Sequence, residues 1–266
     1  MMKTIHYTSG LPRACSTLLQ NLLAQNPRVH ATATSGVHEI MYLSKAFFKT
    51  EEFRSIPQPR DGETLFMDFM RGGIIHAFDS LTDRPVVVDK CRSWIGSASL
   101  LFQLFPNAKL LVPVRDIRGV LSSMEKKFQQ HPGFQMEVTQ ADTGRVQTVE
   151  GRCQFWLDTA PVGIAIQRLH ELVRLHRPKV LFVHAEDLTS CPQETMDKVW
   201  AYLGEEPFTH DLSHVDQYTT EHELGWPFGD HQVKPVVASL KPDWQDTLGR
   251  QLSEALNQKF NWINNL

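Results

Sequence analysis

The chain has 266 residues, of which 41% are hydrophobic and 21% are charged, and its formal net charge is -3 at pH 7. This length suits one α/β domain with a large core, and the charge balance provides no overall basic field, which argues against nucleic acid as the main partner. Four widely separated cysteines without CxxC spacing argue against both a zinc site and a disulfide framework.

The first half of the chain alternates short apolar strands with helices. A strand is predicted over Lys3 to Thr8 and a helix over Ser16 to Gln25, which Asn26-Pro27 ends. A second amphipathic helix over Thr64 to Leu81 precedes the buried strand Val86 to Lys90. The opening therefore has the β-turn-α order of an α/β sheet.

The second half continues this alternation. The predicted elements are a helix over Ser97 to Phe105, a strand over Lys109 to Val114, a helix that runs through Lys127, a long helix over Glu150 to His176 despite Pro161, a fourth strand over Lys179 to Val183, and helices over Gln193 to Leu203 and Asp243 to Phe260. Residues 128–150 and 207–242 are predicted to be irregular. The whole pattern indicates an α/β fold, a three-layer sandwich with a central, mostly parallel sheet.

The turn between the first strand and the first helix has the composition of an anion site. A helix N-terminus presents N–H groups without intrahelical partners and partial positive charge. Arg13 adds a fixed charge, and Ser16 and Thr17 add hydroxyl donors. Cys15 and Ser16 stand where a Walker A loop needs Gly-Lys, so a kinase or ATPase is disfavoured. A plain helix N-cap is the alternative interpretation.

Cations follow the predicted strands at one edge of the sheet, where ligands of parallel α/β sheets bind. Arg13, Lys90 and Arg115 each stand at or just beyond a strand end. Ser123 follows Arg115 by eight residues in the next helix, so the two are expected to hold one phosphate between them. The alternatives are a solvated charge for Lys90 and a local ion pair of Arg115 with Asp116.

Four motifs in order resemble the sulfotransferases that use 3′-phosphoadenosine-5′-phosphosulfate (PAPS). Ser9 to Leu19 resembles their 5′-phosphosulfate loop, and Arg115 with Ser123 resembles their 3′-phosphate motif, including its spacing. Val183 to Leu188 is similar to their V-x-Y-E-D-L segment. Asp230 to Val236 resembles the Q-V-x-K-P-V element of the tyrosylprotein sulfotransferase branch, in which the lysine reaches the cofactor.

This resemblance implies a P-loop-like nucleotide-binding fold in a single domain over residues 1–266, with variable lid segments near 34–60, 128–150 and 207–242. It implies transfer of a sulfuryl group from PAPS to a hydroxyl acceptor, which is a small molecule, a glycan or a tyrosine, with 3′-phosphoadenosine-5′-phosphate as product and no metal. A nucleotide-dependent kinase and a non-catalytic nucleotide-binding module are the alternatives. A homodimer is left open.

The chain contains no apolar run of about 18 residues. The sequence therefore predicts neither a signal peptide nor a membrane span. It predicts a cytoplasmic protein. Acceptor contacts are expected from aromatic residues of the variable segments. These are Tyr42, Phe47, Phe48, Phe134 and Trp226.

The resemblance also assigns roles to individual residues. The cofactor-binding residues that it implies are Leu11, Pro12, Arg13, Ala14, Cys15, Ser16, Thr17, Arg115, Ser123 and Lys234. Lys90 and Arg13 are expected to stabilise charge during transfer. Glu39 is preferred to His38 as the general base, because the tyrosylprotein branch places a glutamate just after the first helix. When residues are counted from Arg13, however, the position of that glutamate falls near Thr34.

The chain departs from the family pattern at two places. Ala14-Cys15 replaces the Ser-Gly of the usual loop, so Cys15 is expected to adopt an ordinary helical conformation, with a thiol pKa lowered by Arg13 and the helix N-terminus. A small residue that fills a tight turn is the alternative interpretation of Cys15. Ala185 replaces the tyrosine of V-x-Y-E-D-L. Trp94 is a candidate for stacking on the adenine instead, and a core position is its alternative.

Overall fold

A five-stranded parallel sheet in the order β2-β3-β1-β4-β5 forms the centre of the described residues, which are 3–132, 143–220 and 232–266 of this computed structural model. Its strands are β1 (Thr4–Thr8), β2 (Val29–Ala31), β3 (Val86–Lys90), β4 (Leu110–Val114) and β5 (Val180–His184). Every strand pairs in parallel with its neighbour. The carboxyl ends of the strands therefore share one edge of the sheet, as the sequence predicts.

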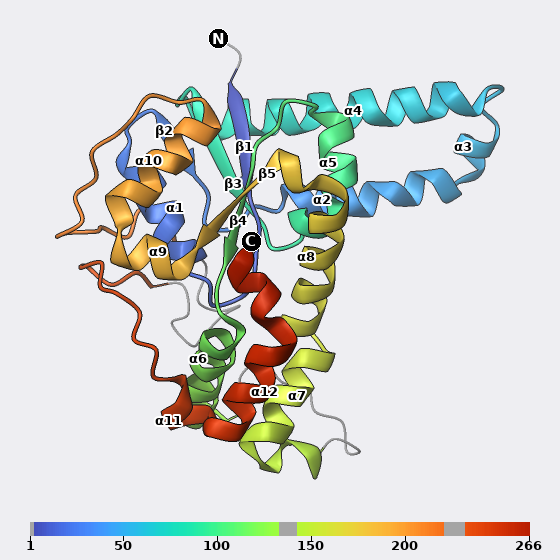
Figure 1. Ribbon diagram of the computed structural model, residues 1–266. Helices are drawn as coiled ribbons and strands as arrows, with labels where there is room; N and C mark the ends of the chain where they lie inside the picture. The colour runs from blue at the N-terminus through green and yellow to red at the C-terminus, as the bar shows by residue number, and fades with distance from the viewer. Residues whose placement is uncertain (1–2, 133–142, 221–231) are drawn as a thin grey trace.

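Helices cover both faces of this sheet (Figure 1). They are α1 (Ser16–Gln25), α2 (Val37–Ser44), α3 (Glu51–Arg54), α4 (Pro59–Leu81), α5 (Ala98–Leu104), α6 (Ile117–Gln130), α7 (Val149–Asp158), α8 (Val162–His176), α9 (Ala185–Ser190), α10 (Pro192–Leu203), α11 (Trp244–Leu248) and α12 (Arg250–Phe260). Val87 of β3 packs in the apolar cluster of α4, α5 and α8, whereas its neighbours Val86 and Val88 pack in the cluster of α1 and α10. Successive strand residues thus serve opposite faces, and the predicted three-layer sandwich is confirmed.

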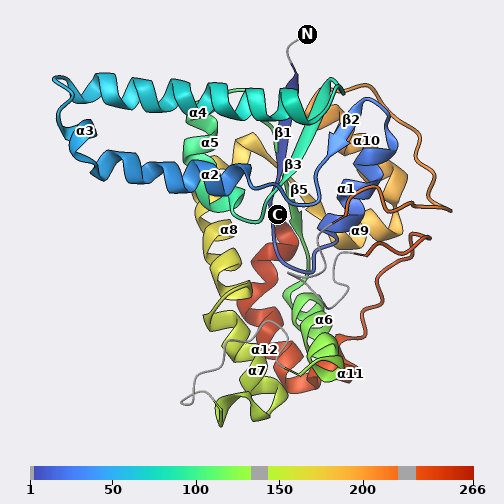
Figure 2. The same ribbon diagram turned by 180° about the vertical axis from the view of Figure 1, so that it is seen from behind.

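Two groups of helices extend beyond the layers. α2, α3 and α4 form an arm that projects sideways from the sheet (Figures 1 and 2). α6, α7, α11 and α12 gather below the sheet in the same two views. None of the described helices combines the length and the apolar character that crossing a bilayer requires.

Two predicted helices are each divided in the structure, and one strand was not predicted. The predicted helix over 150–176 is two helices, α7 and α8, because Pro161 has no N–H and cannot stand inside a helix. The predicted helix over 243–260 divides into α11 and α12 at Gly249, whose φ of +76° lies outside the helical region. The strand β2 was not predicted, because three residues carry too little pattern, and Val180–His184 is consequently the fifth strand.

The predicted irregular segments are only partly irregular. Residues 128–150 include the end of α6, a 3₁₀ turn at Arg145–Gln147 and the start of α7. The described parts of 207–242 contain neither helix nor strand, as expected. Phe134 and Trp226, which were expected to contact the acceptor, lie outside the described residues.

His210, after α10, is buried in its neutral form. Its Nε2 accepts a hydrogen bond from Trp200 Nε1 at 3.0 Å, and its Nδ1 lies 3.3 Å from Gln25 Oε1. An indole N–H only donates, so Nε2 must keep its lone pair. Burial lowers the pKa of His210 to about 4.

We therefore expect the protein to lose stability in mild acid. The folded pKa of His210 lies below that of an unfolded histidine, so the unfolded chain binds more protons, and the free energy of unfolding falls by about 3 kcal/mol as the pH drops from about 6.5 to about 4. Urea unfolding at a series of pH values measures this slope. His6, whose pKa burial also lowers to about 4, adds to it.

The variant His210→Gln should show a smaller slope than the wild type. His76→Gln is the matched control, because the His76 side chain is exposed on α4, and it should leave the slope unchanged. Equal slopes in the wild type and His210→Gln would contradict the assignment.

Candidate functional site

The loop between β1 and α1 lies directly against β4. Leu11 N donates to the Pro113 carbonyl oxygen at 2.9 Å. Ser9 Oγ donates to the Arg92 carbonyl oxygen at 2.9 Å, which ties the loop to the segment after β3. A Cβ on Gly10 would lie 2.1 Å from the Pro113 carbonyl oxygen, so only glycine permits this approach. The loop is thereby held between the ends of two strands.

Two loop residues adopt the left-handed conformation. Arg13 has φ 58°, and Cys15, the N-cap of α1, has φ 59° and ψ 24°. The expected helical conformation of Cys15 is wrong, because the chain must reverse sharply here to enter α1 and Cys15 takes up the dihedrals that glycine adopts freely. An L-residue pays about 1–2 kcal/mol for this conformation. Cys15 provides no side-chain cap, so it leaves the first-turn N–H groups of α1 available to an anion.

The thiol of Cys15 is not activated. Burial raises its pKa, and the opposing charges of Arg115 and Arg13 do not overcome that effect. The expected lowering of its pKa is therefore wrong, because desolvation of the thiolate outweighs two nearby cations. All four cysteines are described, and no disulfide joins any of them.

The loop forms one wall of a cleft of about 1040 Å³ at the carboxyl edge of the sheet. Eight basic side chains belong to its described lining: Arg13, Lys90, Arg92, Arg115, Lys126, Lys127, Lys234 and Lys241. The only carboxylate in that lining is Asp243, which pairs with Lys126 at 2.8 Å. A chain of net charge -3 therefore concentrates positive charge in one place, which attracts anions.

The cleft gathers all the residues that the resemblance assigned to cofactor binding. The loop from Leu11 to Thr17 lines it, together with Lys90, Arg115, Ser123 and Lys234. Four further cations of the lining were not predicted. Lys126 and Lys127 follow Ser123 by three and four positions and therefore share its helix face, which could have predicted that they line the cleft. Lys241 lies in an irregular segment, where no periodicity identifies it.

Three of the predicted residues are directly connected. Arg13 Nε donates to Ser123 Oγ at 3.0 Å, and an Arg115 guanidinium N–H donates to the Arg13 carbonyl oxygen at 2.9 Å. A Cβ on Gly119 would lie 2.7 Å from Arg115 Nε, so Gly119 leaves the room that this guanidinium occupies. Burial lowers the pKa of Arg115, and its Nε has no hydrogen-bond partner among the described residues.

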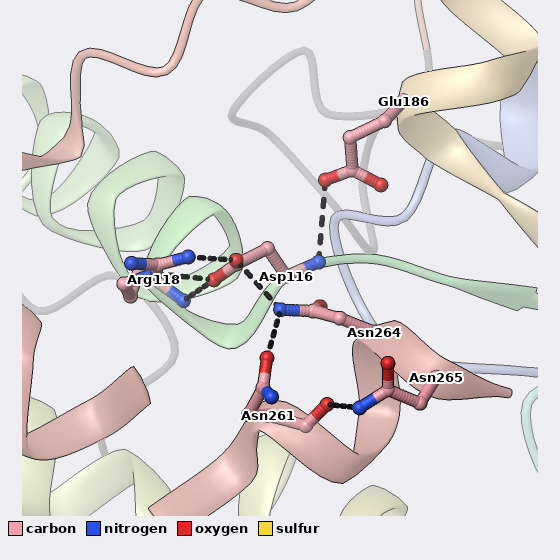
Figure 3. A network of polar contacts seen from close by, with 6 residues as sticks. All are labelled: Asp116, Arg118, Glu186, Asn261, Asn264 and Asn265. Atoms are coloured by element: carbon pink, nitrogen blue, oxygen red, sulfur yellow. Dashed lines mark hydrogen bonds and ion pairs between the residues drawn. The ribbon is translucent and has the colours of Figure 1, made fainter. Parts of the chain in front are cut away.

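Asp116 fixes the start of α6, the helix that carries Ser123 (Figure 3). Its carboxylate accepts from the Arg118 backbone N–H at 2.8 Å, from the Arg118 guanidinium and from Asn264 Nδ2 at 2.9 Å. Its own N–H donates to Glu186 Oε1 at 3.2 Å. Burial alone would raise the pKa of Asp116, but its hydrogen bonds with Arg118 hold that pKa below its usual range. Asp116 therefore caps α6 and pairs with Arg118. The alternative from the sequence, a local ion pair of Asp116 with Arg115, is not what the structure shows.

The two candidate bases lie beside the cleft and outside its lining. His38 is buried, with Nε2 2.9 Å from Ser97 Oγ and Nδ1 3.3 Å from Glu39 Oε1. Burial lowers the pKa of His38, and the Glu39 side chain is 59% exposed. Both side chains come close to Cys91, which lines the cleft. Thr34, where the glutamate of the tyrosylprotein branch falls when residues are counted from Arg13, also lines the cleft.

Trp94 does not face a ligand. It is fully buried, its Nε1 donates to Asp89 Oδ2 at 2.7 Å, and its ring packs edge-on against Tyr7. The candidate role in adenine stacking is wrong, because the indole is needed in the core to satisfy a buried carboxylate. Ala185 is also fully buried.

Comparison with known proteins identifies the family. A family model described as "Sulfotransferase family" matches residues 8–210. The chain belongs to the sulfotransferase family. It is 24% identical over 251 residues to a protein-tyrosine sulfotransferase of Drosophila melanogaster, and the match covers 90% of this chain and 46% of that protein. This sulfotransferase-family chain thus spans about half the length of the curated relative that it matches.

Solved structures share the fold. A sulfotransferase domain from the curacin biosynthetic pathway has a TM-score of 0.57 at 15% identity, with 98% of each chain covered. A sulfotransferase from Alicyclobacillus acidocaldarius has a TM-score of 0.51 at 14% identity, covering 97% of this chain and 92% of that one. A mouse sulfotransferase complexed with PAP has a TM-score of 0.50 at 12% identity, with 100% and 85% covered. The predicted family and fold are confirmed.

The approach of the loop to β4 predicts a sharp requirement at Gly10. In Gly10→Ala the new Cβ meets rigid backbone, so we expect a loss of about 3 kcal/mol in the free energy of unfolding, at the upper end of the usual cost of overpacking. Gly36→Ala is the matched control, because a Cβ there meets nothing within 4 Å. Its unfolding free energy should stay within about 0.5 kcal/mol of the wild type in urea. Similar losses in both variants would refute the close approach.

Proposed function

We propose that the chain is a sulfotransferase that moves a sulfuryl group from PAPS to a hydroxyl acceptor. The observation that carries this proposal is the cleft with eight basic side chains at the carboxyl edge of the sheet. PAPS has two separate anionic groups, a 3′-phosphate and a 5′-phosphosulfate, and a cleft rich in cations suits a ligand of that charge. Bound PAPS supplies the activated sulfuryl group, and 3′-phosphoadenosine-5′-phosphate is the leaving group.

The polar groups of the cleft fit such a ligand. Arg115 Nε and Ser122 Oγ are buried without hydrogen-bond partners among the described residues, and both residues line the cleft. A buried donor without a partner is costly, and an anion that accepts from it removes this cost. The uncapped N-terminus of α1 adds further donors in the same wall.

The roles proposed for the lining residues are those that the resemblance implies. Arg13, with the loop amides and the hydroxyls of Ser16 and Thr17, binds the 5′-phosphosulfate. Arg115 and Ser123 bind the 3′-phosphate, and Lys234 closes over the nucleotide. Lys90, at the end of β3, faces the negative charge that grows on the leaving-group oxygen, which is where a fixed cation lowers the barrier most. These roles require no metal.

Glu39 is the proposed general base. Its Oε1 lies 3.3 Å from His38 Nδ1, so the imidazole orients the carboxylate and leaves Oε2 to accept the proton of the acceptor hydroxyl. The side chain is mostly exposed and can reach an acceptor that enters from solvent, whereas His38 is enclosed. His38 therefore acts as a positioning residue in this proposal.

The acceptor is a small molecule, a glycan or a tyrosine. The name of the Drosophila relative, a protein-tyrosine sulfotransferase, supports a tyrosine. Tyr42 on α2, which is 55% exposed and stacks near His38, is placed to contact an aromatic acceptor. A cytoplasmic location, a homodimer and a single domain over residues 1–266 remain predictions.

The nucleotide assignment predicts selective binding of the 3′-phosphate. In calorimetric titration the protein should bind 3′-phosphoadenosine-5′-phosphate at least 100-fold more tightly than ADP, since ADP leaves the Arg115 and Ser123 donors without a partner. Ser123→Ala should weaken that binding about 10-fold and Arg115→Gln more, in line with about 1.4 kcal/mol or more for a charge-assisted hydrogen bond. Arg250→Ala is the control, because Arg250 lies exposed on α12. A preference for ADP would overturn the proposal in favour of a kinase.

The base assignment predicts a loss of turnover without loss of nucleotide affinity. In Glu39→Gln we expect kcat to fall by about 10²–10⁴, the usual contribution of a general base. Transfer of radiolabelled sulfate to phenols, sugars and tyrosine peptides measures it. Glu63→Gln, an exposed glutamate of α4, should keep full activity. Undiminished turnover in Glu39→Gln would exclude Glu39 as the base, and no transfer by the wild type to any acceptor would favour a non-catalytic module.

A further inference from the structure

Three side chains with different donor atoms converge beside the cleft. His38 and Glu39 of α2 and Cys91, directly after β3, place one ligand atom each within 4.8 Å of the others. Among the residues that the structure describes, this is the group of histidine, cysteine and acidic side chains close enough to share one ion. We propose that His38, Glu39 and Cys91 form a three-ligand site for Zn²⁺ at the wall of the cleft.

The donor set matches the preferences of zinc. An imidazole nitrogen, a carboxylate oxygen and a thiolate sulfur are the three kinds of protein ligand that Zn²⁺ accepts, whereas Ca²⁺ and Mg²⁺ require oxygen alone. With both side chains deprotonated, Glu39 and Cys91 contribute two negative charges, which balance the ion. Binding releases the thiol proton of Cys91 to solvent as the sulfur–zinc bond forms.

The spacing is close to that of a tetrahedral site. Two ligand atoms about 2.0 Å from a tetrahedral zinc are about 3.3 Å apart. His38 Nδ1 and Glu39 Oε1 are 3.3 Å apart. A sulfur at about 2.3 Å from the ion lies about 3.5 Å from the other two ligands. The three ligand atoms lie within 4.8 Å of one another, so the sulfur edges must shorten by at most about 1.3 Å. Rotation of the exposed Glu39 side chain shortens its edge to the sulfur, and small movements of the His38 and Cys91 side chains shorten the other edge.

The two buried ligands are held in place before any ion arrives. The Nε2 of His38 lies 2.9 Å from Ser97 Oγ, and its ring packs at 90° against Trp94. Histidines that bind zinc generally use their second nitrogen for such a bond, which sets the ring orientation. The Cys91 backbone N–H donates to the Thr8 carbonyl oxygen at 3.1 Å, so the sulfur is anchored at the end of the sheet.

The fourth ligand position faces the cleft. Cys91 lines the cleft and the Glu39 carboxylate is exposed, so water or a ligand in the cleft completes the tetrahedron. If Glu39 is the base, as the proposed function has it, bound zinc occupies the carboxylate that must accept the acceptor proton. Zinc then inhibits transfer reversibly, and a chelator restores it.

Zinc affinity tests the site without any need for sulfuryl transfer. The full chain, stripped with a chelator, is titrated with Zn²⁺ in competition with a chromophoric chelator, and with Co²⁺ while the near-ultraviolet sulfur-to-metal absorption is recorded. We expect one Zn²⁺ per chain with a submicromolar Kd, and a Co²⁺ spectrum with a thiolate band. Cys91→Ser should abolish that band, and both Cys91→Ser and His38→Gln should weaken Zn²⁺ at least 100-fold.

Two further variants keep the outcome decisive. Glu39→Gln changes an exposed side chain, leaves the buried packing intact and should weaken Zn²⁺ at least 10-fold. Cys191→Ser removes an exposed cysteine far along the chain and should change neither affinity nor spectrum. Absence of stoichiometric binding, or an affinity that Cys91→Ser leaves unchanged, would overturn the zinc site. Either result leaves the proposed sulfotransferase activity untouched, because nucleotide binding and transfer are measured separately.

Discussion

The contact between the first loop and strand β4 is the constraint on which the site depends. Gly10 brings the loop so close to Pro113 that no side chain fits between them, and Leu11 N bonds the Pro113 carbonyl oxygen. With the loop held there, Arg13 reaches Ser123 across the cleft and its carbonyl oxygen accepts from Arg115. The left-handed dihedrals of Arg13 and Cys15 are the local cost of this arrangement, which the hydrogen bonds to β4 and to the segment after β3 offset.

A second set of contacts places the other wall of the cleft. Asp116 caps α6 and joins it to Glu186 of α9 and to Asn264 near the C-terminus (Figure 3). The buried ion pair of Glu125 with Arg152, in which two hydrogen bonds of 2.6 and 2.8 Å join the side chains, holds the same helix against α7. Glu186 therefore acts on the site through the position of a helix. The Glu-Asp-Leu motif, which resembles a segment of the family, thus has a structural role here through Glu186.

The proposed base and the proposed zinc site use the same carboxylate. Glu39 accepts the acceptor proton in the first case and binds the ion in the second, and the neighbouring Cys91 lines the cleft. A proton acceptor and a metal ligand need the same property, an accessible lone pair on a fixed atom, so one arrangement serves both. Under the proposed function, transfer proceeds when Glu39 is free of zinc and stops when zinc is bound to His38, Glu39 and Cys91.

Much of the fold and of the site is determined by the sequence alone. The apolar runs that became β1, β3, β4 and β5 and the periodicity of the helices are local signals, and the strand-end positions of Arg13, Lys90 and Arg115 follow from them once the strands are parallel. The tertiary structure decided the rest. The short strand β2, the left-handed Cys15, its raised thiol pKa and the burial of Trp94 depend on which distant segments pack nearby. Conformation forced by a neighbouring strand, and pKa values set by desolvation, are properties of the packed environment and leave no pattern in the order of residues.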